Sequence, residues 1–132
     1  MNRDIKHQII IKAAPKAVFE ALMNGKKHSK FTGAPARISS RVGGSFTCYD
    51  GYIKGVNLEL EPGRLIVQAW HSENWPEETW SVVAIRLAKV AGVKTRLTFT
   101  QAGVPKNDYA RKNAGWRTHY WEPLKRFLER GK

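Results

Sequence analysis

One stretch near the C-terminus decides the fold: residues 109–130 read YARKNAGWRTHYWEPLKRFLER. Its large apolar side chains recur at intervals of three and four, the spacing of one face of an α-helix, and they are Tyr109, Trp116, Tyr120, Leu124, Phe127 and Leu128. Charged residues such as Arg111, Lys125 and Glu129 fall at other positions. The pattern predicts an amphipathic helix, strongest over residues 113–130. A kink is expected at Pro123, because proline cannot donate a hydrogen bond to the carbonyl of His119.

The chain before this helix has the pattern of strands separated by turn residues. Leu97 and Phe99 alternate with polar residues over 93–101. One face of the predicted sheet is therefore exposed to solvent, and the apolar face must pack against another element. Glycine and proline interrupt the chain at short intervals, which is typical of an antiparallel meander. The predicted strands are 5–13, 36–41, 45–49, 52–60, 65–71, 79–90 and 93–101.

One or two small helices are predicted between the first two strands. Pro15 suits the first turn of a helix, and an apolar face follows it up to Asn24-Gly25. Residues 26–33 predict a short turn or a second small helix. The sequence therefore predicts an α+β fold, with a curved antiparallel sheet of about seven strands around a long C-terminal helix, as one domain over residues 1–132.

Composition limits the class of protein. The chain has 132 residues, 42% hydrophobic and 26% charged, which suits one soluble globular domain. Its longest apolar runs fall far short of the roughly 20 residues that cross a bilayer, so no membrane insertion is predicted. Cys48 is the only cysteine, which excludes an internal disulfide and suits a reducing compartment. Because charged residues interrupt the N-terminus where a secretory signal would be apolar, we expect a cytoplasmic protein.

The net charge of +12 is unevenly distributed along the chain. Residues 1–55 carry 10 Lys and Arg against 3 Asp and Glu, residues 56–85 carry 1 against 5, and residues 86–132 carry 12 against 3. A basic body could attract nucleic acid, an anionic membrane or an acidic protein, or it could be only a solvated surface. Since no nucleic-acid-binding motif accompanies the charge, no specific nucleic-acid partner is predicted.

Several short strings, taken in order, resemble one family. They are AAP (13–15), VFEAL (18–22), RVGGSF (41–46), LELEP (58–62), WS (80–81), TRLTF (95–99), GVP (103–105), GW (115–116) and YW (120–121). The chain resembles the activator of heat-shock protein 90 ATPase homologues, within the START-like (SRPBCC) superfamily. The resemblance implies a helix-grip fold with a cavity between sheet and helix that favours apolar ligands. The eukaryotic activator uses an additional N-terminal domain, so ATPase stimulation is not carried over to this chain.

Catalytic signatures are lacking in the sequence. No Gly-x-Ser-x-Gly string, phosphate-binding glycine loop or closely spaced set of metal ligands occurs, and no cofactor or metal is predicted. Cys48 alternates with Phe46 in a strand and is interpreted as a small buried residue rather than a nucleophile. His71 ends a strand beside acidic residues; a histidine bonded to backbone is favoured over a general base.

The segment 70–80 has the most unusual local composition, with three tryptophans and three glutamates. Trp75 could mark a binding loop, since tryptophan is enriched among interface hot spots. Trp70 and Trp80 could instead stabilise a hairpin by facing each other across paired strands. For Trp75 both interpretations stay open.

Three hypotheses of function follow. The first is a non-catalytic binding domain for a small apolar or amphipathic molecule, lined by Phe46, Cys48, Val67, Ser81, Val83, Phe99, Trp116 and Tyr120. The second is a protein-interaction module, such as a stress-related co-chaperone that binds a chaperone or other protein through Trp75 and Glu77. The third is a cyclase- or dehydratase-like enzyme, which ranks last because the predicted interior offers few acid–base groups.

Overall fold

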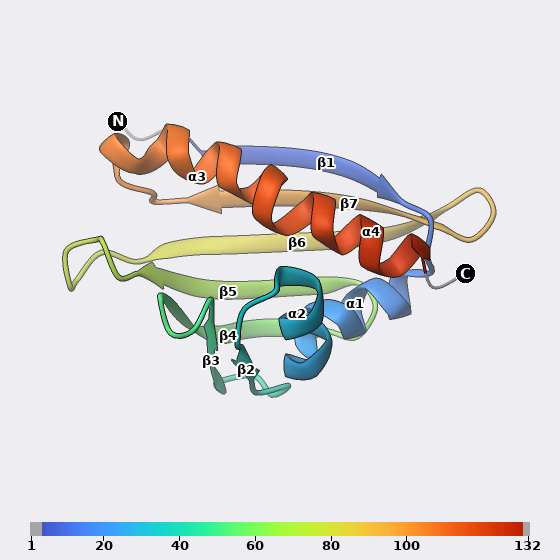
Figure 1. The fold of residues 1–132 in the computed structure, drawn as a ribbon, viewed down its shortest axis with the longest axis horizontal. Helices are drawn as coiled ribbons and strands as arrows, with labels where there is room; N and C mark the ends of the chain where they lie inside the picture. Colours follow the sequence, from blue (N-terminus) through green and yellow to red (C-terminus); the bar gives the residue numbers. More distant parts are fainter. Residues whose placement is uncertain (1–3, 131–132) are drawn as a thin grey trace.

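Seven antiparallel strands form one curved sheet in the computed structural model, which describes residues 4–130 (Figure 1). The strand order is β1-β7-β6-β5-β4-β3-β2. The strands are β1 (Ile5–Ile11), β2 (Arg37–Ile38), β3 (Ser45–Cys48), β4 (Ile53–Glu61), β5 (Leu65–Ser72), β6 (Ser81–Val90) and β7 (Lys94–Ala102). Two small helices follow β1, namely α1 (Pro15–Met23) and α2 (Gly25–Thr32). This is the predicted helix-grip architecture.

The C-terminal helix lies across one face of the sheet, the face turned toward the viewer in Figure 1. It follows a single 3₁₀ turn, η1 (Lys106–Asp108), and continues through α3 (Tyr109–Gly115), η2 (Trp116–Trp121) and α4 (Glu122–Arg130). It therefore begins earlier than the predicted range 113–130. Within residues 4–130, none of the helices is apolar over a length that could cross a lipid bilayer.

A π-helical segment, η2, interrupts this helix just before Pro123. The amide of Glu122 donates to the carbonyl of Arg117, five residues earlier. The carbonyl of His119, to which Pro123 has no N–H to donate, accepts a hydrogen bond from the Tyr49 hydroxyl at 2.9 Å. The helix thus departs from α geometry at the place where a kink was predicted.

The wider π turn changes which side chains share the buried face. Trp116 and Trp121 stack with ring centroids 5.2 Å apart and planes 20° apart. In an α-helix, residues five apart point about 140° away from each other. Trp121 therefore lies outside the apolar face predicted from the spacing of residues, although it is one of the largest fully buried side chains.

The predicted strand over 36–41 was wrong in length, because β2 holds only Arg37 and Ile38. The carbonyls of Ser39 and Arg41 accept hydrogen bonds from the side-chain amide of Asn57, at 2.7 and 2.9 Å. The Asn57 side chain thus bonds to backbone carbonyls that, in a longer strand, would bond to the neighbouring strand. Asn57 also lies where the β4–β5 register shifts, at a bulge that leaves Leu58 exposed.

The hydrophobic core lies between the sheet and the helices. Alternate residues of β1 and β7 face it, as the period-two pattern predicted, and Ile5, Ile11, Leu97 and Phe99 are fully buried. Leu124 from α4 and Val18 from α1 close the same layer. At the other end of the helix, η1 and α3 contact the β5–β6 connection, because the Trp75 indole bonds to Asp108 and the Lys112 ammonium lies over the Trp75 ring.

Candidate ligand cavity

A cavity of about 680 Å³ opens between the sheet and the first half of the C-terminal helix. This volume is within the range of small-molecule sites. Aromatic side chains dominate its wall: Tyr49, Tyr52, Trp70, Trp75, Trp116 and Tyr120. The polar members of its lining include Ser72, Gln101, Arg111, Lys112 and His119, and among the residues that the structure describes no Asp or Glu lines the cavity.

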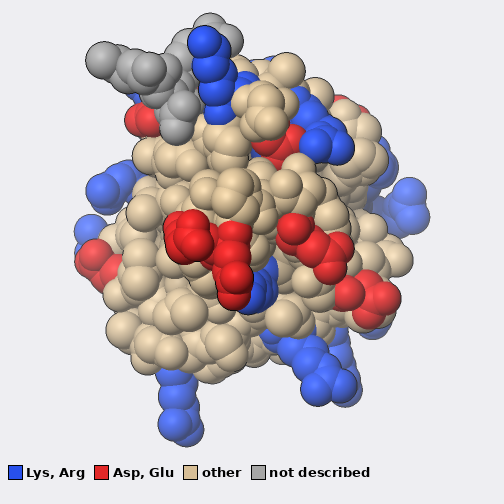
Figure 2. Space-filling view, turned by 90° about the vertical axis from the view of Figure 1, so that its left-hand side faces the viewer, with Lys and Arg blue, Asp and Glu red and all other residues tan. Residues whose placement is uncertain are grey.

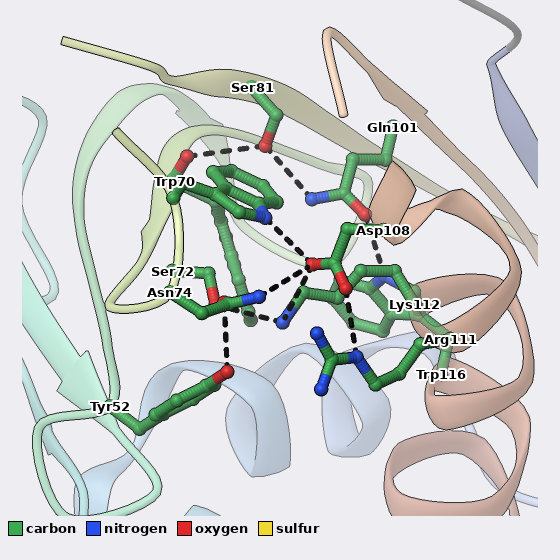
Figure 3. Close-up of polar contacts among 11 residues, drawn as sticks. Tyr52, Trp70, Ser72, Asn74, Ser81, Gln101, Asp108, Arg111, Lys112 and Trp116 are labelled. Atoms are coloured by element: carbon green, nitrogen blue, oxygen red, sulfur yellow. Dashed lines mark hydrogen bonds and ion pairs between the residues drawn. The ribbon is translucent and has the colours of Figure 1, made fainter. Parts of the chain in front are cut away.

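Hydrogen bonds hold the aromatic wall in place (Figure 3). The indole of Trp116 donates to Gln101 Oε1 at 2.7 Å, and Gln101 Nε2 donates to Ser81 Oγ at 2.9 Å. Ser81 Oγ in turn donates to the carbonyl of Trp70 at 3.2 Å. The rings of Trp70 and Trp116 lie 4.9 Å apart. These hydrogen bonds orient the Trp116 indole in the wall, because each buried polar atom that they join has a partner.

Asp108 lies under one corner of the cavity and is only 2% exposed. Its Oδ2 accepts hydrogen bonds from the Trp75 indole at 2.7 Å and from Asn74 at 3.3 Å, and its Oδ1 accepts from Arg111 Nε at 2.9 Å. Burial opposes ionisation of Asp108, but these donors and the Lys112 charge outweigh it and lower the pKa of the carboxyl. Asp108 is therefore a carboxylate that organises this corner.

Lys112 brings a second cation to the same corner. Its Nζ lies 3.7 Å from Asp108 Oδ2 and donates to Ser72 Oγ at 2.9 Å (Figure 3). The ammonium also lies 5.1 Å from the ring centroid of Tyr52 and 5.6 Å from that of Trp75. Burial lowers the pKa of Lys112, and the Asp108 charge partly offsets that effect. Together these four residues form the polar corner of the cavity: Ser72, Asp108, Arg111 and Lys112.

A second buried cluster joins His28, Cys48 and Tyr120 behind the cavity wall. His28 Nε2 is 2.7 Å from the Tyr120 hydroxyl and 3.8 Å from Cys48 Sγ. Burial lowers the pKa of His28 to about 4 and raises the pKa of Cys48 to about 12. Cys48 is thus a neutral buried thiol, as the alternation with Phe46 predicted, and it lacks the thiolate that a nucleophile needs.

The structure brings some of the predicted ligand-binding residues to the cavity and not others. Trp116 and Tyr120 line it. Ser81, Val83 and Phe99 are fully buried in the layer behind, where the Phe99 ring packs 4.3 Å from that of Trp116. Three others lie elsewhere. Phe46 and Cys48 pack around a much smaller space of about 10 Å³, and Val67 is a half-buried residue between the core-facing Ile66 and Gln68.

Of the two predicted protein-interaction residues, Trp75 is buried and Glu77 is exposed. The Trp75 indole is 6% exposed and points at Asp108 rather than into solvent. Glu77 lies with the exposed Glu73 and Glu78 on the β5–β6 connection. Acidic side chains gather on the face that carries this connection, and Lys and Arg project around its edge (Figure 2).

The predicted contact between Trp70 and Trp80 was wrong. Trp70 pairs with Ser81 across β5 and β6 and is buried on the core face, whereas Trp80 is 41% exposed and packs against the ring of His71 at 5.2 Å. Neighbouring residues of an extended chain point to opposite faces of the sheet. Because Ser81 points into the core, Trp80, which precedes it, points toward solvent. His71 is bonded to backbone, as predicted, because its Nδ1 donates to the carbonyl of Thr79 at 2.8 Å.

Sequence reasoning missed the polar corner. Asp108, Arg111 and Lys112 are three and four residues apart, a spacing at which ion pairs form on one helix, and this signal could have pointed to them. Nothing in the sequence indicated that Ser72, forty positions away, would join them. In the part of the chain that the structure describes, no group of three or more His, Cys, Asp or Glu side chains could hold a metal ion.

Comparison with known proteins identifies relatives of this chain. It is 29% identical to an activator of 90 kDa heat shock protein ATPase homolog of Dictyostelium discoideum, over 94% of the chain and 32% of that protein. It is 33% identical to homolog 2 of Mus musculus, over 76% of the chain and 30% of that protein. The chain thus spans about a third of the length of these relatives.

Solved structures share the fold. An HSP90 activator from Plasmodium falciparum superposes with a TM-score of 0.91 at 21% identity, covering 97% of both chains. The Aha1 dimer from Colwellia psychrerythraea gives a TM-score of 0.85 at 24% identity, covering 99% of both. The model of one family, described as activator of Hsp90 ATPase homolog 1-like protein, matches residues 12–129. The chain therefore belongs to the activator of Hsp90 ATPase homolog 1-like family.

Proposed function

We propose that this chain is a non-catalytic binding domain that holds a small apolar or amphipathic molecule between its sheet and its C-terminal helix. The observation that carries the proposal is the cavity of about 680 Å³ walled by six aromatic side chains. Aromatic surface gains free energy when it is covered, at roughly 25 cal/mol for every Å² removed from water. The hydrogen-bonded wall adds to this gain, because a preformed site loses little side-chain freedom on binding.

The state of Cys48, His28 and Asp108 supports binding rather than catalysis. Cys48 is a thiol with a raised pKa, and His28 lies behind Tyr120 rather than in the cavity wall. Asp108 is 2% exposed and is not among the lining residues, so its carboxylate is not placed to take a proton from a molecule in the cavity.

Titration with an uncharged fluorescent probe, phenylnaphthylamine, tests the proposal. The expected result is one probe per chain, with emission enhanced by the apolar wall. Ala114 is exposed and lines the cavity, so Ala114→Trp should fill part of it and weaken binding at least tenfold. Ala110, one turn earlier on α3, is exposed and outside the lining, so Ala110→Trp is the matched control. Folded wild-type protein that takes up no probe would overturn the proposal.

A second candidate function is docking to an Hsp90-type chaperone in the cytoplasm. It is favoured by the family and by the relatives that are named as activators of the heat shock protein ATPase. The surface charges of both signs offer a means of steering such an encounter. Calorimetric titration of Hsp90 with this chain tests it, and Glu77→Lys should weaken binding if the acidic β5–β6 connection contributes. Glu20→Lys, on exposed α1 surface, makes the same change of charge elsewhere.

A further inference from the structure

The polar corner gives the cavity a net positive charge. Arg111 and Lys112 are both among its lining residues, and the single carboxylate of Asp108 lies buried beneath them. One negative charge therefore faces two positive charges. Since no Asp or Glu side chain within residues 4–130 belongs to the lining itself, a ligand at this corner meets the cations Arg111 and Lys112.

The Lys112 ammonium is positioned to meet a ligand. It has three N–H donors, and within residues 4–130 one of them bonds to Ser72 Oγ while Asp108 Oδ2 is farther away, at 3.7 Å. Its side chain is 17% exposed, unlike that of Arg111, which is 71% exposed. Held by Ser72 and by the rings of Tyr52 and Trp75, Lys112 loses little freedom when a ligand arrives.

The rest of the wall restricts where a charge on the ligand can lie. An anion surrounded by aromatic rings without a counter-charge would lose its hydration and gain no ion pair in return. The apolar body of a ligand gains by covering Trp70, Trp116 and Tyr120, whereas an anionic group gains only beside a cation. Opposite ends of one amphipathic molecule therefore suit opposite parts of the cavity.

We propose that the ligand of this cavity carries one anionic oxygen group, a carboxylate or sulfonate, which pairs with the Lys112 ammonium while the apolar body lies against the aromatic wall. The inference rests on the proposed function and deepens it, because it assigns the chemical class of the ligand and the residue that selects it. Small acids with an apolar ring or chain are the class this geometry fits.

Two probes that share a ring system provide the test. Anilinonaphthalene sulfonate carries an anionic group, and phenylnaphthylamine is its uncharged counterpart. We expect wild-type protein to bind the sulfonate about tenfold more tightly, a ratio that corresponds to about 1.4 kcal/mol. Lys112→Met should remove this preference, measured as the ratio of the two probe affinities on the same variant. Lys112→Arg should retain it. Lys89→Met removes a lysine that is exposed near the far end of β6, and it should change neither affinity.

The outcomes separate the two proposals. If wild-type protein binds both probes equally, or if Lys112→Met keeps the preference, the inference fails while the cavity function stands. Because the wild-type comparison needs no variant, it decides the matter even if Lys112→Met does not fold. If sulfonate binding survives Ala114→Trp, the probe is bound by the basic surface and the inference is also wrong. If folded wild-type protein binds neither probe, the proposed function fails and the inference fails with it.

Discussion

His28 should make the stability of this protein depend on pH between about 6.5 and 4. The side chain is buried behind Tyr120, and burial lowers its pKa from 6.5 to about 4. As the pH falls below 6.5, the unfolded chain takes up a proton on His28 while the folded chain does not. Stability therefore falls with decreasing pH over this window, because the unfolded state binds more protons.

The size of the effect follows from the two pKa values. A difference between 6.5 and about 4, at about 1.36 kcal/mol per pH unit, corresponds to about 3 kcal/mol of unfolding free energy lost across the window. That loss is a substantial part of the 5 to 15 kcal/mol that is usual for a folded domain. His7 also has a lowered pKa, caused mainly by burial, and contributes in the same direction.

Urea unfolding at pH 7 and pH 4.5, of wild type and of His28→Gln, measures the effect. Glutamine does not titrate and can still bond to the Tyr120 hydroxyl, so the variant should lose about 2 to 3 kcal/mol less than wild type between the two pH values. Wild type and variant share His7 and all carboxylates, so the contributions of these groups to the pH dependence cancel when the two proteins are compared. If both proteins lose the same free energy, His28 is not held neutral by burial and the reasoning is wrong.

Three further predictions concern stability and are measured by urea midpoints at pH 7. Trp116→Ala should cost about 3 to 5 kcal/mol, because it empties the centre of the aromatic wall, whereas Trp80→Ala should cost below about 1 kcal/mol. Gly55→Ala should destabilise the protein strongly, because a Cβ there would lie 2.2 Å from a backbone oxygen of β5. Gly115→Ala has room for the Cβ and should stabilise the helix by about 0.5 to 1 kcal/mol. Equal effects of the two substitutions would contradict this packing. Asp108→Asn should cost about 1.5 to 3 kcal/mol at pH 7. Because the pKa of Asp108 is lowered, its carboxylate stabilises the fold above about pH 4 and loses this contribution as the pH falls toward the folded pKa, so variant and wild type should converge in acid.

Local patterns along the chain were sufficient to predict most of the fold. Alternation of apolar residues marked β1 and β7, and the spacing of Trp116, Tyr120 and Leu124 marked the covering helix. These patterns act over a few residues, because each strand or helix must turn one side toward the core. The order of short strings was enough to indicate the family, since turns and core positions recur along related chains.

The tertiary structure alone decided how the site is built. The π turn places Trp121 on the buried face of the helix. The Trp75 indole points inward and bonds to Asp108. Lys112 bonds to Ser72, which lies forty positions earlier in the sequence. Periodicity states which side of an element faces the core, but not how completely the facing side chains fill the space between two elements. The cavity is the part of that space that they leave open, so it depends on distances between segments that are remote in sequence.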